Sequence, residues 1–183
     1  MRIIAGAHRG RKLNTLQGDA TRPTLDSTRE ALFNILSTRV RDARVLDAFG
    51  GSGAITLEAI SRGAVAATIF ELAPDACKII SENIALCSAQ DKVTLKKGDA
   101  ITLLAKESEE FDLIFLDPPY RRGLADEALS VIAEKGLLGE NGLIVVETGA
   151  DEGVNVPKGL LLTRSRRYGR TLLHFIEYEG EEN

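Results

Sequence analysis

Four consecutive residues, Asp117-Pro118-Pro119-Tyr120, follow the apolar run Phe111–Leu116 and combine a carboxylate, two rigid backbone positions and an aromatic ring. The prolines fix φ twice, so this stiff segment can aim its carbonyl groups. An exocyclic amine on a nucleobase is a poor nucleophile because its lone pair is delocalised into the ring. Two acceptors bonded to its protons favour a more pyramidal nitrogen, and the Asp117 carboxylate with the Pro118 carbonyl can supply them. With Tyr120 stacked on the ring, the segment predicts a site that prepares a planar amino nitrogen for attack.

A glycine-rich turn supplies a second chemical feature. The apolar run Val45–Phe49 leads into Gly50-Gly51-Ser52-Gly53, where glycines allow a tight turn and close approach of a ligand. Thr56 stands where a third glycine would complete a dinucleotide fingerprint. Asp47, directly ahead of the glycines, is awkward for a pyrophosphate but suits the ammonium group of S-adenosylmethionine. The turn therefore favours S-adenosylmethionine over a nicotinamide dinucleotide.

Two further acidic residues end apolar runs that we expect to be strands. Glu71 comes about twenty residues after the glycine turn, where a carboxylate can bind ribose hydroxyls of either cofactor. Asp99 can accept a hydrogen bond from an adenine amino group, or it can cap the helix expected over Ala100–Ala105. The sequence leaves both roles of Asp99 open.

The elements that position these residues alternate between strand and helix from Arg44 onward. Near-continuous apolar strands in such an order predict a parallel sheet covered on both faces. Strands are expected at Val45–Phe49, Ala67–Glu71, Val93–Leu95, Phe111–Leu116 and Leu143–Glu147, and helices at Ala54–Ser61, Pro74–Cys87, Ala100–Ala105 and Ala125–Lys135.

The two ends of the chain depart from this alternation. Met1–Leu16 predicts a short hairpin with glycines at its turn, and a capping box at Ser27 and Glu30 predicts a helix from about Asp26 to Arg39. Near the carboxyl end, Leu160–Thr163 and Leu172–Tyr178 should pair antiparallel across a basic connection, residues 164–170. We expect one domain over residues 1–183, with an extension at 1–40 and a core at 41–183.

Charge and composition limit the possible partners. The net charge is −4, yet residues 1–44 carry nine Lys/Arg against four Asp/Glu, and residues 163–175 carry four Arg and no acid. Two basic ends on an acidic body indicate a localised anionic partner. We expect no membrane span, no signal peptide and no metal site. The two cysteines, Cys77 and Cys87, fit a reducing compartment as free thiols. We therefore expect a cytoplasmic protein, and we expect it to be a monomer.

The motifs together resemble those of class I S-adenosylmethionine-dependent methyltransferases, with a Rossmann-like α/β fold. Asp117–Tyr120 is similar to the (Asn/Asp)-Pro-Pro-(Tyr/Phe) motif of enzymes that methylate amino or amide nitrogens. The segments at residues 22–36, 46–53 and 168–171 resemble the RsmD family, which methylates N2 of a guanine in 16S ribosomal RNA of the small subunit. The resemblance implies S-adenosylmethionine as cofactor, a catalytic set of Asp117, Pro118, Pro119 and Tyr120, and a cofactor-binding set of Asp47, Phe49, Gly50, Gly51, Gly53, Glu71, Leu72, Asp99 and Ala100.

The basic ends gain a role in this interpretation. Phosphate contacts would supply affinity and position rather than sequence recognition. The candidate RNA-binding residues are Arg9, Arg11, Lys12, Arg22, Arg166 and Arg167, with Arg164 and Arg170 beside them. We expect the shape of the assembled small subunit to supply the specificity.

Other functions share some of these features. The four-residue motif also permits adenine or cytosine of DNA, or a protein glutamine, as the methyl acceptor. A nicotinamide-dependent oxidoreductase would need the missing third glycine, and a non-catalytic RNA-binding module would not need an intact Asp117.

Overall fold

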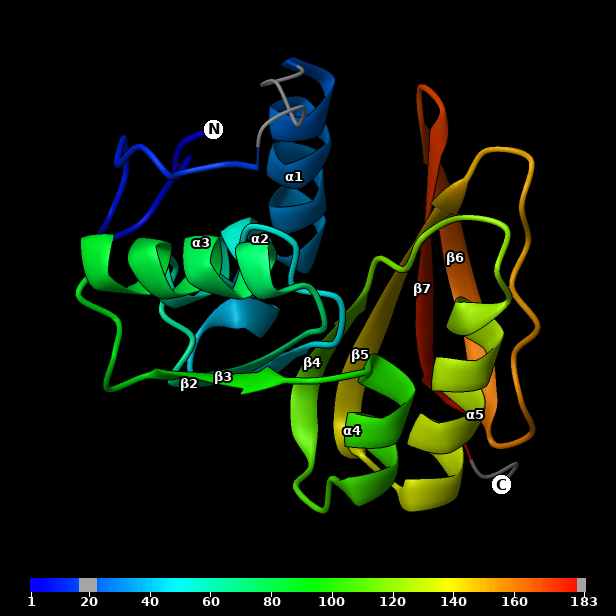
Figure 1. Ribbon diagram of the computed structural model, residues 1–183. Helices are drawn as coiled ribbons and strands as arrows, with labels where there is room; N and C mark the ends of the chain where they lie inside the picture. The colour runs from blue at the N-terminus through cyan, green and yellow to red at the C-terminus, as the bar shows by residue number, and fades with distance from the viewer. Residues whose placement is uncertain (17–22, 181–183) are drawn as a thin grey trace.

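One mixed sheet organises the molecule. The computed structural model describes residues 1–16 and 23–180, without the side chains of residues 23–25. In this part of the chain the strand order is β3-β2-β1-β4-β5-β7-β6, parallel from β3 to β5 and antiparallel at β7 and β6 (Figure 1). The strands are β1 (Arg44–Asp47), β2 (Ala66–Glu71), β3 (Val93–Lys97), β4 (Phe111–Leu116), β5 (Leu138–Gly149), β6 (Leu160–Tyr168) and β7 (Thr171–Tyr178).

Helices cover both faces of this sheet. Residues of α1, α2 and α3 share one apolar cluster with one face, and residues of α4 and α5 share a second cluster with the other face. Figure 1 shows the two groups of helices on opposite sides of the strands. The helices are α1 (Pro23–Leu36), η1 (Ser37–Val40, a 3₁₀ turn), α2 (Ala54–Ser61), α3 (Pro74–Leu86), α4 (Ala100–Lys106) and α5 (Leu124–Lys135).

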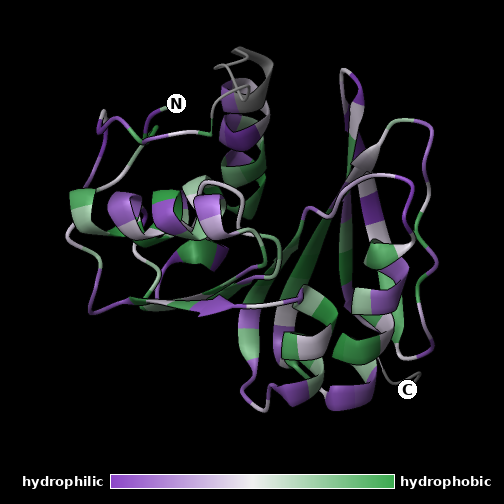
Figure 2. Cartoon of the chain, in the orientation of Figure 1, coloured by the Kyte–Doolittle hydropathy of each residue, from purple (hydrophilic) through white to green (hydrophobic). Residues whose placement is uncertain are grey.

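Alternation along β4 explains why residues 113–116 are apolar at every position, whereas Asp112 near its start is exposed. Leu113 and Phe115 pack toward α1–α3, whereas Ile114 and Leu116 pack toward α4 and α5. Successive side chains of a strand point to opposite faces, so a strand covered on both sides has no polar face. Figure 2 shows the hydrophobic central strands between the two helical layers. The predicted α/β class, with a mostly parallel sheet and antiparallel carboxyl-terminal strands, is confirmed.

The carboxyl-terminal hairpin differs from the prediction in its boundaries. We expected Leu160–Thr163 to be the strand and the arginine-rich segment to be its connection, but β6 continues to Tyr168. Only Gly169 and Arg170 lie between β6 and β7. The cause is its position: β6 is an edge strand, exposed along most of its length, so charged residues fit there and hydropathy does not mark it.

The amino-terminal extension also differs from the prediction. Residues 1–16 fold back antiparallel as expected, with a bridge between Arg2 and Lys12 and three backbone hydrogen bonds between residues 1–3 and 10–13, but they form no regular strands. The amide groups of Ile4 and Ala5 donate to the carboxylate of Glu58 on α2 instead of to a partner strand. Helix α1 begins at Pro23, three residues before the expected start, because proline suits the first helical position.

Candidate active site

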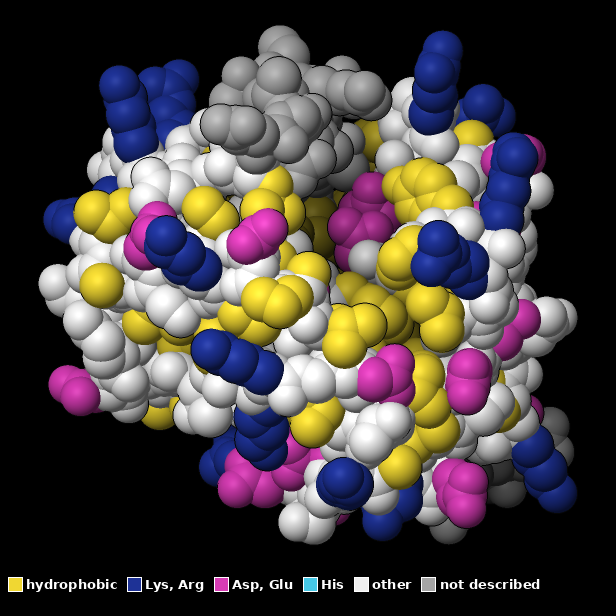
Figure 3. Space-filling view, in the orientation of Figure 1, with side chains coloured by type: hydrophobic (Ala, Val, Ile, Leu, Met, Phe, Trp, Pro, Cys, Tyr) yellow, Lys and Arg dark blue, Asp and Glu magenta, His cyan; other side chains and the backbone are white. Residues whose placement is uncertain are grey.

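A cleft of about 960 Å³ opens at the carboxyl ends of the parallel strands. Open α/β sheets bind ligands at this edge, beside the point where the strand order reverses, here between β1 and β4. Figure 3 shows the surface hollowed at this side, with acidic side chains inside the hollow and apolar side chains below it. Among the predicted site residues, those that line the cleft are Phe49, Gly51, Glu71, Leu72, Asp99, Ala100, Asp117, Pro118, Pro119 and Tyr120.

The glycine turn brings backbone to the cleft. A Cβ on Gly50 would lie 2.3 Å from Cγ2 of Ile69, so no side chain fits there. Gly51 and Gly53 have φ values of 54° and 76°, in the left-handed region that favours glycine. Helix α2 starts directly after Gly53, so its free N–H groups face this edge. Gly51 lines the cleft, whereas Gly50 and Gly53 shape the turn without lining the cleft.

Asp47 lies beneath this turn rather than in the cleft wall. Its side chain is 4% exposed and accepts a 2.9 Å hydrogen bond from the hydroxyl of Thr56 on α2. Burial raises the pKa of Asp47 to about 6, although hydrogen bonds from Thr56 and the Phe49 amide favour the ionised form. Asp47 thus ties the end of β1 to α2 and keeps a carboxyl group beside the cleft.

Glu71 connects the turn to the next strand. Its Oε2 accepts from the Gly51 amide at 2.9 Å, and its Oε1 accepts from the Ala73 amide at 2.7 Å. A carboxylate oxygen has more than one lone pair, so both oxygens can still accept hydrogen bonds from a ligand's hydroxyls. The backbone therefore holds Glu71 in one orientation at the cleft wall.

Asp99 acts as a helix cap, one of the two roles that the sequence left open. Its Oδ1 accepts from the backbone amide and from the hydroxyl of Thr102, both at 2.8 Å. These bonds lower the pKa of Asp99 and keep its carboxylate ionised. Asp99 and Ala100 also line the cleft, so the capping role and a ligand contact are compatible.

The Asp-Pro-Pro-Tyr segment forms the opposite wall. Pro118 is buried and anchors the segment, whereas Asp117 and Tyr120 open onto the cleft. Protein on the inner side of Asp117 desolvates its carboxylate and, with the negative charges of Glu147 and Asp47, raises its pKa well above the usual value. A carboxylate with a raised pKa is a better proton acceptor once it is ionised.

Glu147 contacts this wall through Tyr120, and its role was not predicted from the sequence. Its Oε1 accepts from the Tyr120 hydroxyl at 3.2 Å and from the Thr171 hydroxyl at 3.3 Å. Burial raises the pKa of Glu147, and the two hydroxyls oppose that shift. A signal was present, because Glu147 ends the apolar run of β5 at the ligand edge of the sheet.

Two arginines after Tyr120 were also missed. Arg122 lines the cleft. Arg121 has a φ of 60°, pairs with Asp151 at 2.6 Å and donates its backbone amide to Glu152. They bring positive charge to a wall that is otherwise acidic.

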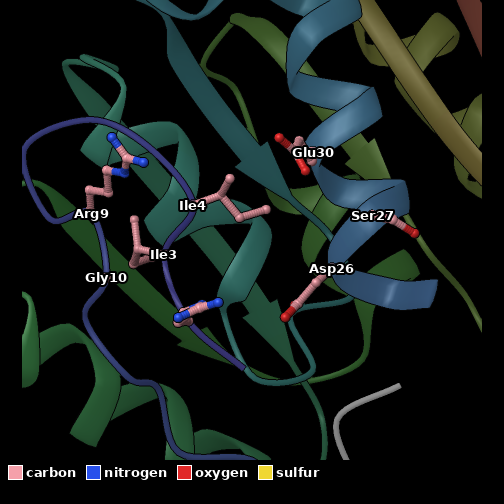
Figure 4. A pocket seen from close by; sticks show the side chains of 8 residues that line it. Ile3, Ile4, Arg9, Gly10, Asp26, Ser27 and Glu30 are labelled. Atoms are coloured by element: carbon pink, nitrogen blue, oxygen red, sulfur yellow. The ribbon is translucent and has the colours of Figure 1, made fainter. Parts of the chain in front are cut away.

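The basic residues of the amino-terminal loop lie on the surface. Arg9, Arg11 and Lys12 are exposed, and Arg11 donates to the carbonyl of Leu86 at the end of α3. A separate pocket of about 640 Å³ lies between this loop and α1, and Figure 4 shows Arg9 and Glu30 among its lining residues. The loop therefore presents cations beside α1 and α3, outside the cleft itself.

The remaining basic candidates lie on the edge strand. Arg164, Arg166 and Arg167 are exposed on β6, and the Arg164 guanidinium lies 4.6 Å from the centre of the Phe175 ring. Arg22 lies outside the described residues. Within the described part of the chain, no His/Cys/Asp/Glu group could hold a metal ion, and no helix is long and apolar enough to cross a membrane.

Comparison with known proteins places this geometry in a family. The family model described as Conserved hypothetical protein 95 matches residues 1–177. The chain is 36% identical to the ribosomal RNA small subunit methyltransferase D of Escherichia coli (strain K12) over 99% of its own length and 91% of that protein. A solved Escherichia coli protein superimposes with a TM-score of 0.88 at 35% identity, covering 99% of both chains.

A more distant structure shares the fold alone. The S-adenosylhomocysteine-bound methyltransferase of Podospora anserina is 18% identical, with a TM-score of 0.67, and the match covers 85% of this chain and 82% of that one. The near-complete match to the family model and to the Escherichia coli relative confirms the resemblance that the motifs predicted. The chain therefore belongs to this family, the RsmD family of ribosomal RNA small subunit methyltransferases.

Proposed function

We propose that the chain transfers a methyl group from S-adenosylmethionine to the exocyclic N2 of a guanine in 16S ribosomal RNA of the small subunit. One observation carries the proposal: the Asp117–Tyr120 segment faces Glu71, Asp99 and Ala100 across a single cleft. One cavity therefore contains both the hydrogen-bond acceptors for the target amine and the wall that would bind the nucleoside of the cofactor. The relative's name supplies the ribosomal substrate.

The cleft suits S-adenosylmethionine in both polarity and shape. Glu71 offers carboxylate oxygens to ribose hydroxyls, and Phe70, Leu72 and Ala100 offer apolar surface beside an adenine. The absence of a Cβ on Gly51 lets backbone approach the ligand. Asp47 and Asp117 provide negative charge near an ammonium and a sulfonium, and such charges would in turn lower the raised pKa values of these carboxyl groups.

The residues of the Asp-Pro-Pro-Tyr segment prepare the amine. The Asp117 carboxylate and the Pro118 carbonyl accept hydrogen bonds from N2, and Tyr120 holds the base by stacking. The sulfonium of the cofactor supplies an activated methyl group. As the N2–C bond forms and the S–C bond breaks, N2 loses one proton, which Asp117 accepts. The stiff segment contributes alignment, because in-line transfer needs the two groups held close together.

The basic segments would hold the RNA around this cleft. The target base must leave its stack to reach Asp117, either by flipping or from an unpaired region. Arg9, Arg11 and Lys12 on the loop and Arg166 and Arg167 on β6 are exposed cations on two sides of the molecule. A chain of 183 residues has little surface for reading a long sequence, which supports the assembled subunit as the substrate.

The assembly and location of the protein form part of the proposal. We propose one methyltransferase domain that acts as a monomer in the cytoplasm. Two observations support this: both apolar clusters lie against the same sheet, and Cys77 and Cys87 are free thiols buried in the protein.

The decisive experiment transfers labelled methyl from S-adenosylmethionine to small subunits that lack the modification, with naked 16S RNA as a parallel substrate. Label in one guanine at N2, on subunits in preference to naked RNA, is the expected result. Label on adenine, cytosine or protein would contradict the proposed acceptor. Equal rates on naked RNA would contradict the role of the assembled subunit.

A further inference from the structure

Glu147 and Asp117 occupy neighbouring positions at the carboxyl edge of the sheet. In the parallel register of β4 and β5, Leu116 pairs with Val146, and Asp117 and Glu147 come directly after that pair. Adjacent strands lie about 4.8 Å apart. Desolvation raises the pKa of Asp117, and the negative charge of Glu147 raises it further, as expected for two neighbouring carboxylates. Asp117, which lines the cleft, therefore has a second carboxylate beside it.

The hydrogen bonds of Glu147 leave one of its oxygens available. Oε1 accepts from Tyr120 and Thr171, so the carboxylate is held in one orientation. Among the described residues, no hydrogen bond reaches Oε2. The side chain is partly open to solvent. A fixed carboxylate with a free oxygen beside Asp117 can bind a donor that lies next to the reacting amine.

Guanine is the base whose edge fits two neighbouring acceptors. Its N1–H donor lies directly beside the N2 amino group. In adenine and cytosine, the ring nitrogen beside the amino group is an acceptor, and it would face the Glu147 oxygen with no proton between them. A buried polar group left unpaired is costly, so a site built to accept a proton rejects a base that lacks it.

We propose that Glu147 determines the base specificity by accepting a hydrogen bond from N1–H of the target guanine while Asp117 and the Pro118 carbonyl bind N2. This inference rests on the proposed function. Glu147 acts on the choice of base, and Asp117 acts on the reacting nitrogen. The hydroxyls of Tyr120 and Thr171 position Glu147 and favour its ionised, accepting form.

The substitution Glu147→Gln separates this role from a purely structural one. The amide oxygen of glutamine can still accept from Tyr120 and Thr171, so the orientation of the side chain is kept. Its NH₂ group then takes the place of Oε2. This donor would oppose N1–H of guanine but would match 2,6-diaminopurine, which keeps the 2-amino group and has an acceptor at N1.

The test compares these two bases at the mapped target position in reconstituted small subunits. The wild-type protein should prefer guanine over 2,6-diaminopurine by at least about 100-fold in kcat/KM. E147Q should reduce this preference by at least about tenfold. The control T171V removes one positioning hydroxyl and leaves the carboxylate in place, so it should keep the wild-type base preference even where the rate falls. Stabilisation by S-adenosylhomocysteine checks that each variant is folded.

The outcomes separate the inference from the proposed function. A wild-type protein that leaves guanine N2 unmethylated would overturn the function. Guanine methylation with no wild-type discrimination against 2,6-diaminopurine would overturn the inference alone. An unchanged preference in E147Q would do the same. Loss of activity on both bases in a folded E147Q would also overturn it, because Glu147 would then act on methyl transfer rather than on the choice of base.

Discussion

Arg166 and Glu147 flank the same residue, Leu173, from opposite sides of β7. Paired residues on neighbouring strands point to the same face of a sheet, so all three side chains share one face. That face is the one toward α1, because Leu173 packs in the cluster with α1. Arg167 pairs with Leu172 and lies on the other face. The two adjacent arginines of β6 therefore face different environments.

The register predicts different effects for these two arginines. Arg166→Glu should weaken binding to small subunits about tenfold or more and reduce the salt slope by about one, because one phosphate contact is lost. Arg167→Glu changes the charge equally but points to the other face, so it should have a clearly smaller effect. Binding measured at several salt concentrations checks this. Equal losses for the two variants would show that the RNA contacts both faces of β6, and no loss for either would place the RNA path elsewhere.

Asp117 should be required for turnover, whereas cofactor binding should largely survive its removal. Asp117→Ala removes an acceptor for N2, and kcat should fall about 10²–10³-fold. Asp117→Asn keeps an accepting oxygen and should lose less. Single-turnover methyl transfer measures the rate, and the thermal shift with S-adenosylhomocysteine measures binding. An active Asp117→Ala protein would refute the role of this carboxylate.

Asp47 should make stability depend on pH in a defined direction. Burial raises its pKa from an ordinary 3.8 to about 6, so in that window the folded protein holds more protons than the unfolded chain. Its contribution to the free energy of unfolding therefore falls as pH rises from about 4 to 6, by about 3 kcal/mol for about two pKa units. Asp47→Asn should flatten this slope, stabilise the free protein at pH 7 and weaken cofactor binding.

Urea unfolding at several pH values measures the effect of Asp47. Asp75→Asn, at an exposed position in the first turn of α3, is the control and should change the stability by no more than about 0.5 kcal/mol. A pH slope that persists in Asp47→Asn would assign it to other groups.

Glu58 should be the residue that fastens the amino-terminal loop. It is fully buried, accepts from the Ile4 and Ala5 amides and pairs with Arg62 at 2.7 Å. Glu58→Gln removes the negative charge beside Arg62 and beside the buried Arg29, which keeps its pair with Asp26, and should cost about 3 kcal/mol. Glu109→Gln, which breaks the exposed pair with Arg44, should cost less than about 1 kcal/mol.

Limited proteolysis localises the effect of the Glu58 substitution. Residues 1–16 should be cut faster in Glu58→Gln than in Glu109→Gln. Equal cleavage of the two variants would show that the loop is held by its apolar contacts instead.

The sequence predicted what depends on local pattern and missed what depends on pairing in space. Apolar runs predicted β4 and its helices, and the Asp117–Tyr120 segment could be placed at the ligand edge. Glu147 was missed because its importance depends on two relationships in space. It follows the β4–β5 pair beside Asp117, and it accepts a hydrogen bond from Tyr120. The extent of β6 was missed because an exposed edge strand tolerates arginine.

Helix α2 connects the two surfaces that the reaction needs. It begins at the glycine turn after Gly53, and it ends at Ser61, which accepts from the Ala7 and His8 amides of the loop. Eight helical residues span only about 12 Å, so one short helix separates the loop from the glycine turn. If RNA binding displaces the loop and the displacement passes through α2 to the glycine turn, the affinities for RNA and cofactor are thermodynamically linked, and each ligand changes the affinity for the other by the same factor.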